Sequence, residues 1–129
     1  MKYYHMGPWP VHVGFTNSNK AFNREMKRLG ITGQSMVNAG SHATCHEFVD
    51  DNGSQLIIVA IKTGKRWSRE QVAGMIAHEA THVVEFMRGS LQRGETLGSE
   101  AEAYLVQYIT QECLATLWKT GRKRSIKPK

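Results

Sequence analysis

The sequence has little of what crosslinks a chain or anchors it in a membrane. Its 129 residues include two cysteines and three prolines, and aromatic residues make up only 9%. Two cysteines are too few for a disulfide framework, so Cys45 and Cys113 are expected to be buried thiols in a reducing cytoplasm. The chain has no run of about 18 apolar residues and no apolar signal segment at its start. We therefore expect a soluble, cytoplasmic protein with no membrane span.

Acidic residues are absent from the last part of the chain. After Glu112 the sequence has six basic residues and no acid: Lys119, Arg122, Lys123, Arg124, Lys127 and Lys129. Without these six, 11 basic residues stand against 11 acids, so they account for the whole net charge of +6. This composition predicts a disordered basic tail, residues 119–129, after a single domain of residues 1–118. The tail either keeps the protein in solution or docks on an acidic partner such as nucleic acid.

A metal-binding pattern lies near the middle of the chain. His78, Glu79 and His82 form the motif H-E-x-x-H. On a helix, positions i and i+4 share one face with Cβ atoms roughly 5 to 6 Å apart, so two imidazoles there can bind one ion at about 2.0 to 2.1 Å each. Glu79 lies round the helix from this pair, where it can take a proton from a metal-activated water.

The residues around the motif favour a helix. Ser68 and Gln71 form a capping box at its expected start, and Gly89 is expected to end it. Apolar residues recur between these ends at helical spacing: Val72, Met75, Ile76, Val83 and Phe86.

A third ligand is available on a second long helix that is expected to begin near Ser99. Glu102 falls on the apolar stripe of this helix, whereas Glu100 projects with Gln107 and Gln111. The stripe consists of Leu105, Ile109, Cys113 and Leu117. A carboxylate on the core side needs a partner, which a metal ion can supply. The alternative is that Ser99 and Glu102 form only another capping box.

The motif with Glu102 twenty residues after His82 resembles the zinc-binding pattern of the gluzincin metallopeptidases, the group that includes thermolysin. The chain lacks room for the flanking domains of thermolysin and looks more like the minimal single-domain members, many of them uncharacterised phage or prophage proteins. The resemblance implies that His78, His82 and Glu102 bind Zn²⁺ and that Glu79 is the general base for hydrolysis of a peptide or protein substrate. Thermolysin-like enzymes place an aspartate one turn after the third ligand to orient the first histidine. Here that position is Val106.

The rest of the chain predicts an α+β fold. Residues 11–16 are expected to form a strand and residues 20–29 a helix. Residues 42–49 and 54–63 are expected to form a hairpin, with the second strand central and the first at a sheet edge. We therefore expect a small antiparallel sheet packed against the motif helix and a second long C-terminal helix.

The resemblance also implies an edge strand that holds the substrate and a hydrogen-bond donor for the transition state. Residues 42–49 would form that wall of the cleft. The donor would be one of His42, His46, Tyr104 and Tyr108, which the sequence does not separate. A second zinc site at His42, Cys45 and His46 is disfavoured, because four strand residues span roughly 13 Å and neighbouring side chains face opposite ways.

Two other functions stay open at this point. The protein could be a zinc-stabilised, non-catalytic binding protein that masks a host protein or a nucleic acid, which the missing aspartate and the basic tail favour. Alternatively, no metal binds and the histidines only pack.

Overall fold

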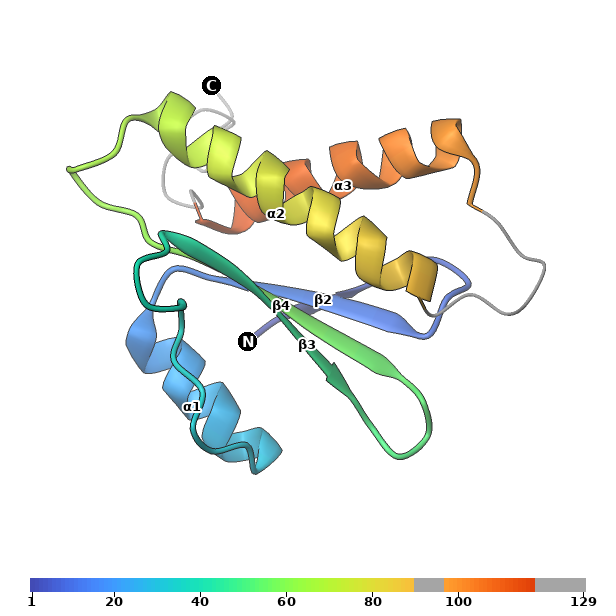
Figure 1. The fold of residues 1–129 in the computed structure, drawn as a ribbon, viewed down its shortest axis with the longest axis horizontal. Helices are drawn as coiled ribbons and strands as arrows, with labels where there is room; N and C mark the ends of the chain where they lie inside the picture. The colour runs from blue at the N-terminus through green and yellow to red at the C-terminus, as the bar shows by residue number, and fades with distance from the viewer. Residues whose placement is uncertain (90–96, 118–129) are drawn as a thin grey trace, which may run out of the picture.

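The computed structural model describes residues 1–89 and 97–117, in which four strands and three helices form an α+β fold (Figure 1). The strands are β1 (Tyr3–His5), β2 (Val11–Thr16), β3 (Ala43–Val49) and β4 (Gln55–Ile61). The helices are α1 (Asn19–Leu29), α2 (Arg69–Gly89) and α3 (Ser99–Leu117). The predicted α+β class is confirmed. The predicted tail, residues 119–129, lies outside the described residues.

The sheet is mixed, in the order β1-β2-β4-β3. Its outer pairs are antiparallel, as expected of a hairpin, but the central strands β2 and β4 run parallel, with Val11 opposite Gln55 and Thr16 opposite Ala60. The sheet is therefore not antiparallel throughout, because α1 and β3 carry the chain back before β4 pairs with β2. Strand β3 lies at an edge and β4 in the centre, as the hairpin pattern predicted.

Helices cover both faces of the sheet (Figure 1). On one face α1 forms a small core in which Phe22 and Met26 pack with Ile58 and Ala60 of β4. On the other face α2 and α3 build the larger core with the opposite side chains of β2 and β4. Its most buried members include Val11, Val13, Ile57, Val59, Ile61, Ile76, Val83 and Ile109. Alternate side chains of the central strands thus point to opposite faces of the sheet and contribute to two separate cores.

Strand β1 was not predicted, because it has only three residues and precedes Pro8 and Pro10. Gly14, its partner on β2, leaves room for the Tyr3 ring: a Cβ at Gly14 would lie 2.8 Å from Tyr3 Cε1. The Tyr3 hydroxyl then donates a hydrogen bond to Glu25 of α1. A missing side chain on β2 therefore lets the first strand connect to the first helix.

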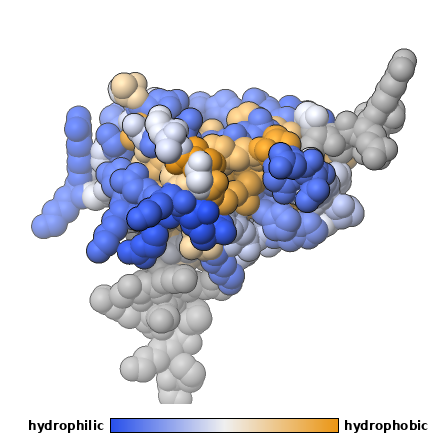
Figure 2. Space-filling model, turned by 90° about the horizontal axis from the view of Figure 1, so that it is seen from below, coloured by the Kyte–Doolittle hydropathy of each residue, from blue (hydrophilic) through white to orange (hydrophobic). Residues whose placement is uncertain are grey.

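The face that carries α1 has apolar atoms in its middle, surrounded by hydrophilic residues (Figure 2). A cavity of about 740 Å³ on this side lies between the end of α1 and the β3–β4 hairpin. Its apolar lining residues are Leu29, Ile31, Phe48, Val49 and Leu56.

The structure bears on two absences noted in the sequence. Within residues 1–89 and 97–117, no helix combines the length and the apolar character that a membrane crossing requires. Both cysteines are free thiols; Cys113 is buried and Cys45 is half-buried. Burial raises the pKa of both thiols, that of Cys113 to about 12.

Candidate active site

Helix α2 carries three of the four predicted site residues. It begins with the predicted capping box: Gln71 N donates to Ser68 Oγ at 3.1 Å, and Ser68 N donates to Gln71 Oε1 at 2.8 Å. These bonds satisfy backbone donors that a helix start leaves open. The helix is then held on the sheet by a buried stripe: Val72, Ile76, Ala80, Val83, Val84 and Met87. His78 and His82 thus project from a fixed element.

The two histidines point their Nε2 atoms at each other. His78 Nε2 and His82 Nε2 are 3.2 Å apart, and the ring planes meet at 76°. Two nitrogen ligands at about 2.05 Å from a tetrahedral zinc ion lie roughly 3.3 Å apart. The pair therefore has the separation that two imidazole ligands of one zinc ion need.

Glu79 lies next to His78 in sequence but turns inward. Its side chain is only 5% exposed. Burial raises the pKa of its carboxyl group, and the nearby His82, His78 and His46 partly oppose this effect. A carboxylate with a raised pKa is a stronger base at neutral pH than an ordinary one. Glu79 therefore combines the burial and the position that a general base beside the histidine pair requires.

A cleft of about 380 Å³ opens beside His78 and Glu79. One wall is the first half of α2 and the other is the chain that leads into edge strand β3. Its lining residues are Gly40, Ser41, His42, Ala43, Gly74, Met75, His78 and Glu79. Gly74 lies one helical turn before His78, so that its missing side chain widens the cleft where the histidine stands. The cleft brings a sheet edge next to the motif.

His42 is the one of the four candidate donors that lines this cleft. Its ring packs edge-on against Trp67, with the centroids 5.1 Å apart, and Trp67 in turn lies under the Arg66 guanidinium at 5.5 Å. These contacts hold the His42 ring at the end of the sheet, across the cleft from His78.

The other three candidates face elsewhere. His46 is buried on the α1 side of the sheet, where its Nε2 is 2.8 Å from the Met36 carbonyl oxygen and its ring packs on Phe22. Tyr104 and Tyr108 are exposed on α3. Cys45 packs against the larger core, whereas His46 packs on the α1 side, so these two side chains lie on opposite faces of the sheet.

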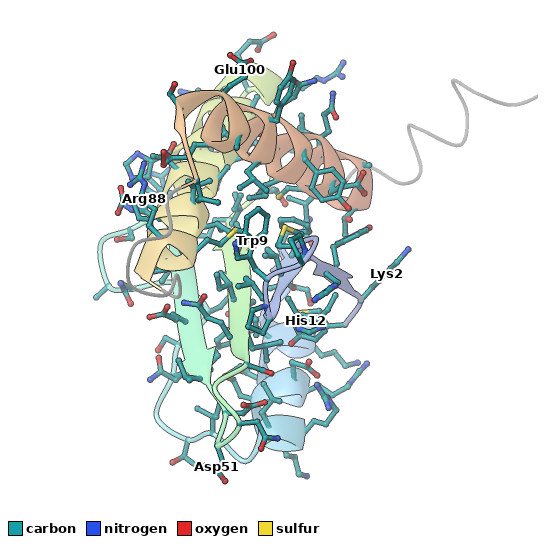
Figure 3. All side chains as sticks on the ribbon, turned by 90° about the vertical axis from the view of Figure 1, so that its right-hand side faces the viewer. Lys2, Trp9, His12, Asp51, Arg88 and Glu100 are labelled. Carbon is teal, nitrogen blue, oxygen red and sulfur yellow. The ribbon has the colours of Figure 1, made fainter. Side chains whose placement is uncertain are left out.

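The third predicted ligand is not with the histidines. The Glu102 carboxylate accepts a hydrogen bond from Arg88 Nε near the end of α2. The Glu102 side chain is 22% exposed. Glu100 is exposed on the outside of α3 and points away from the sheet (Figure 3). The observed partner of Glu102 is thus Arg88 rather than the backbone of a capping box at Ser99.

In the described part of the chain, no three His, Cys, Asp or Glu side chains come together as a metal site. The histidine pair fits two zinc ligands, and the predicted third ligand is engaged by a guanidinium. A complete site requires Glu102, or another donor, to join the pair.

Sequence reasoning did not identify two residues that contact the site. Arg88 is one of them, and Glu85 is the other: its Oε2 lies 3.3 Å from Nδ1 of His82. The i, i+3 spacing from His82 was the available signal for Glu85. Val106, which stands where thermolysin-like enzymes have an aspartate, packs instead against the larger core.

Comparison with known proteins identifies no relative: no family model, no curated protein and no solved structure matches this chain.

Proposed function

We propose that the protein is a zinc-dependent peptide-bond hydrolase in which His78, His82 and Glu102 hold Zn²⁺ and Glu79 is the general base. The observation that supports this best is the 3.2 Å separation of the two Nε2 atoms, directly beside the buried Glu79. The same cleft holds His78 and Glu79, so a substrate in it would meet both.

The chain's own residues would divide the reaction as follows. A zinc ion held by the two imidazoles would polarise the peptide carbonyl and acidify water, which is the chemistry that this metal supplies in hydrolases. Glu79 accepts the proton of the attacking water and delivers it to the departing amine nitrogen.

Two features of the cleft support binding of an extended peptide. Among the described residues no strand pairs with the outer edge of β3, so its backbone can pair with a substrate strand. His42 lines the wall opposite His78, where its ring can donate a hydrogen bond to the carbonyl oxygen as charge develops there.

In this proposal Glu102 has two partners. The ion pair with Arg88 holds its carboxylate on the flank of α2, and metal binding would exchange that guanidinium for zinc. Both interactions compensate the same partly buried charge.

A second candidate is the non-catalytic, zinc-stabilised binding protein. The Arg88–Glu102 ion pair favours it, because a carboxylate that stays with Arg88 leaves the histidine pair without its third ligand.

Zinc content and hydrolysis distinguish the two candidates. We expect one zinc per chain in the parent and none in His78→Ala or His82→Ala, because each change removes a ligand. Glu79→Gln should keep zinc and lose hydrolysis of a peptide library, while the matched control Glu70→Gln on the exposed start of α2 keeps both. Zinc that persists in both histidine variants would refute the site. A parent that holds zinc but cleaves nothing would favour the binding protein.

The third ligand is tested with three alanine variants. Glu102→Ala should lower zinc affinity by roughly tenfold or more, whereas Glu100→Ala should leave it unchanged. Arg88→Ala, which removes the competing partner, should not weaken zinc binding. If Glu102→Ala binds zinc as tightly as the parent, the third ligand is another residue.

A further inference from the structure

Glu85 lies at the ring nitrogen of His82 that does not face His78. His82 turns Nε2 toward His78, 3.2 Å away, and presents Nδ1 to Glu85 Oε2 at 3.3 Å. The two ring nitrogens of His82 thus have separate partners: one faces the position that two ligands share, and the other faces a carboxylate.

This arrangement selects one form of the ring. An ionised carboxylate only accepts hydrogen bonds, so Nδ1 must carry the proton that it donates to Glu85. In a neutral imidazole the other nitrogen, Nε2, then carries a lone pair instead of a proton. That lone pair points at the His78 side, where a metal ion would need it.

The contact between Glu85 and His82 affects the His82 ring more than the stability of the fold. Both side chains are well exposed, His82 at 40% and Glu85 at 49%, and exposed pairs of this kind contribute little to stability. They are three residues apart on α2, whose buried stripe fixes the backbone of both. Among the described residues no carboxylate forms such a contact with His78, whose ring instead contacts His82.

We propose that Glu85 is a positioning residue for His82, which holds Nδ1–H against its carboxylate and so aims the Nε2 lone pair at the metal position. This inference rests on the proposed zinc site. It adds a residue that the H-E-x-x-H motif does not include, one turn further along the same helix.

The test measures zinc affinity by competition with a chelating dye, using the full-length protein. We expect Glu85→Ala to weaken zinc binding about 10- to 100-fold, the usual loss when a ligand's outer partner is removed. Glu85→Gln should stay within a few-fold of the parent, because its amide oxygen still accepts from Nδ1–H. Glu70→Ala, an exposed glutamate on the same helix, should not change the affinity.

A second measurement reports the ring itself. Nitrogen NMR of the metal-free protein, at a pH where the ring is neutral, should find His82 protonated on Nδ1 in the parent and in Glu85→Gln. In Glu85→Ala this preference should be lost. Loss of a purely structural contact would not change which ring nitrogen carries the proton. If Glu85→Ala fails to fold, the Glu85→Gln variant still provides a test.

Each contrary result has one meaning. Parent-like zinc affinity in Glu85→Ala overturns the positioning role and leaves the proposed function intact. Equal losses in Glu85→Gln and Glu85→Ala also overturn it, because the amide oxygen of Gln can still accept the hydrogen bond from Nδ1–H. Zinc retained in His78→Ala and His82→Ala overturns the proposed function itself.

Discussion

Glu25 connects the N-terminal strand to α1 through a single carboxylate. Arg28 donates two hydrogen bonds to it at 2.7 and 2.8 Å, and the Tyr3 hydroxyl donates another. The hydrogen bonds from Arg28, followed by that from Tyr3, lower the pKa of Glu25 from 4.5 to about 2, although burial acts in the opposite direction. The ionised carboxylate is therefore the form that the folded state prefers.

This pKa gives a pH dependence with a definite sign. The contribution of Glu25 to the free energy of unfolding is fully present above about pH 4.5 and is lost as the pH falls toward 2. At pH 7, Glu25→Gln should lower the free energy of unfolding by about 1 to 3 kcal/mol, and the difference from the parent should shrink with acid. Urea unfolding between pH 7 and pH 2.5 measures this, with exposed Glu100→Gln as the control. A difference that stays constant with pH would contradict the assignment.

Residue pairs that are close in sequence were predictable, and pairs from different elements were not. His78, Glu79 and His82 share one helix, so their spacing alone fixes which side chains stand together. The partner of Glu102 depends on how α3 crosses α2, which no local pattern encodes. The sequence also left open which histidine faces the cleft. The direction of His46 depends on which way the pleat of β3 turns, and His42 lies just before β3, where the strand pattern does not apply.

At the scale of elements, the helix ends and the hairpin were predictable because their signals are local. Each signal acts within a few residues. Ser68 bonds Gln71 at the start of α2, and Asp50 bonds the turn of the hairpin. Ser18 and Gly30 cap the two ends of α1. The parallel pairing of β2 with β4 was missed because it joins strands that are distant in sequence. The apolar run of β4 is typical of a central parallel strand. The prediction used this pattern for the central position of the strand but not for its parallel pairing.

The capping box of α2 is a separate test at this scale. Ser68→Ala removes the acceptor for Gln71 N and should cost about 1 kcal/mol of stability. Zinc affinity should not change, because His78 lies almost three turns further along the helix. Thermal unfolding and zinc titration measure the two effects, and Ser35→Ala in the exposed loop before β3 is the matched control. A loss of zinc binding would mean that the start of α2 reaches the site.

At the scale of the whole molecule, the charge distribution makes a prediction about partners. Removing residues 119–129 leaves 11 basic and 11 acidic residues and so abolishes the net charge of +6. If the tail docks on nucleic acid, the full-length protein should bind it with a steep salt dependence, and the truncated protein should not. Fluorescence anisotropy with a labelled oligonucleotide at 50 and 200 mM salt measures both. Binding that survives truncation would move the contact to the rest of the chain.

The parallel pairing at the centre of the sheet also sets an order of events as the chain folds. The imidazole pair needs only one helical turn, which forms on the timescale of local structure, whereas β2 must find β4 across a long intervening segment. Glu79 is shielded from water only when α2 lies on that completed sheet. The two histidines can therefore come together before Glu79 is shielded from water.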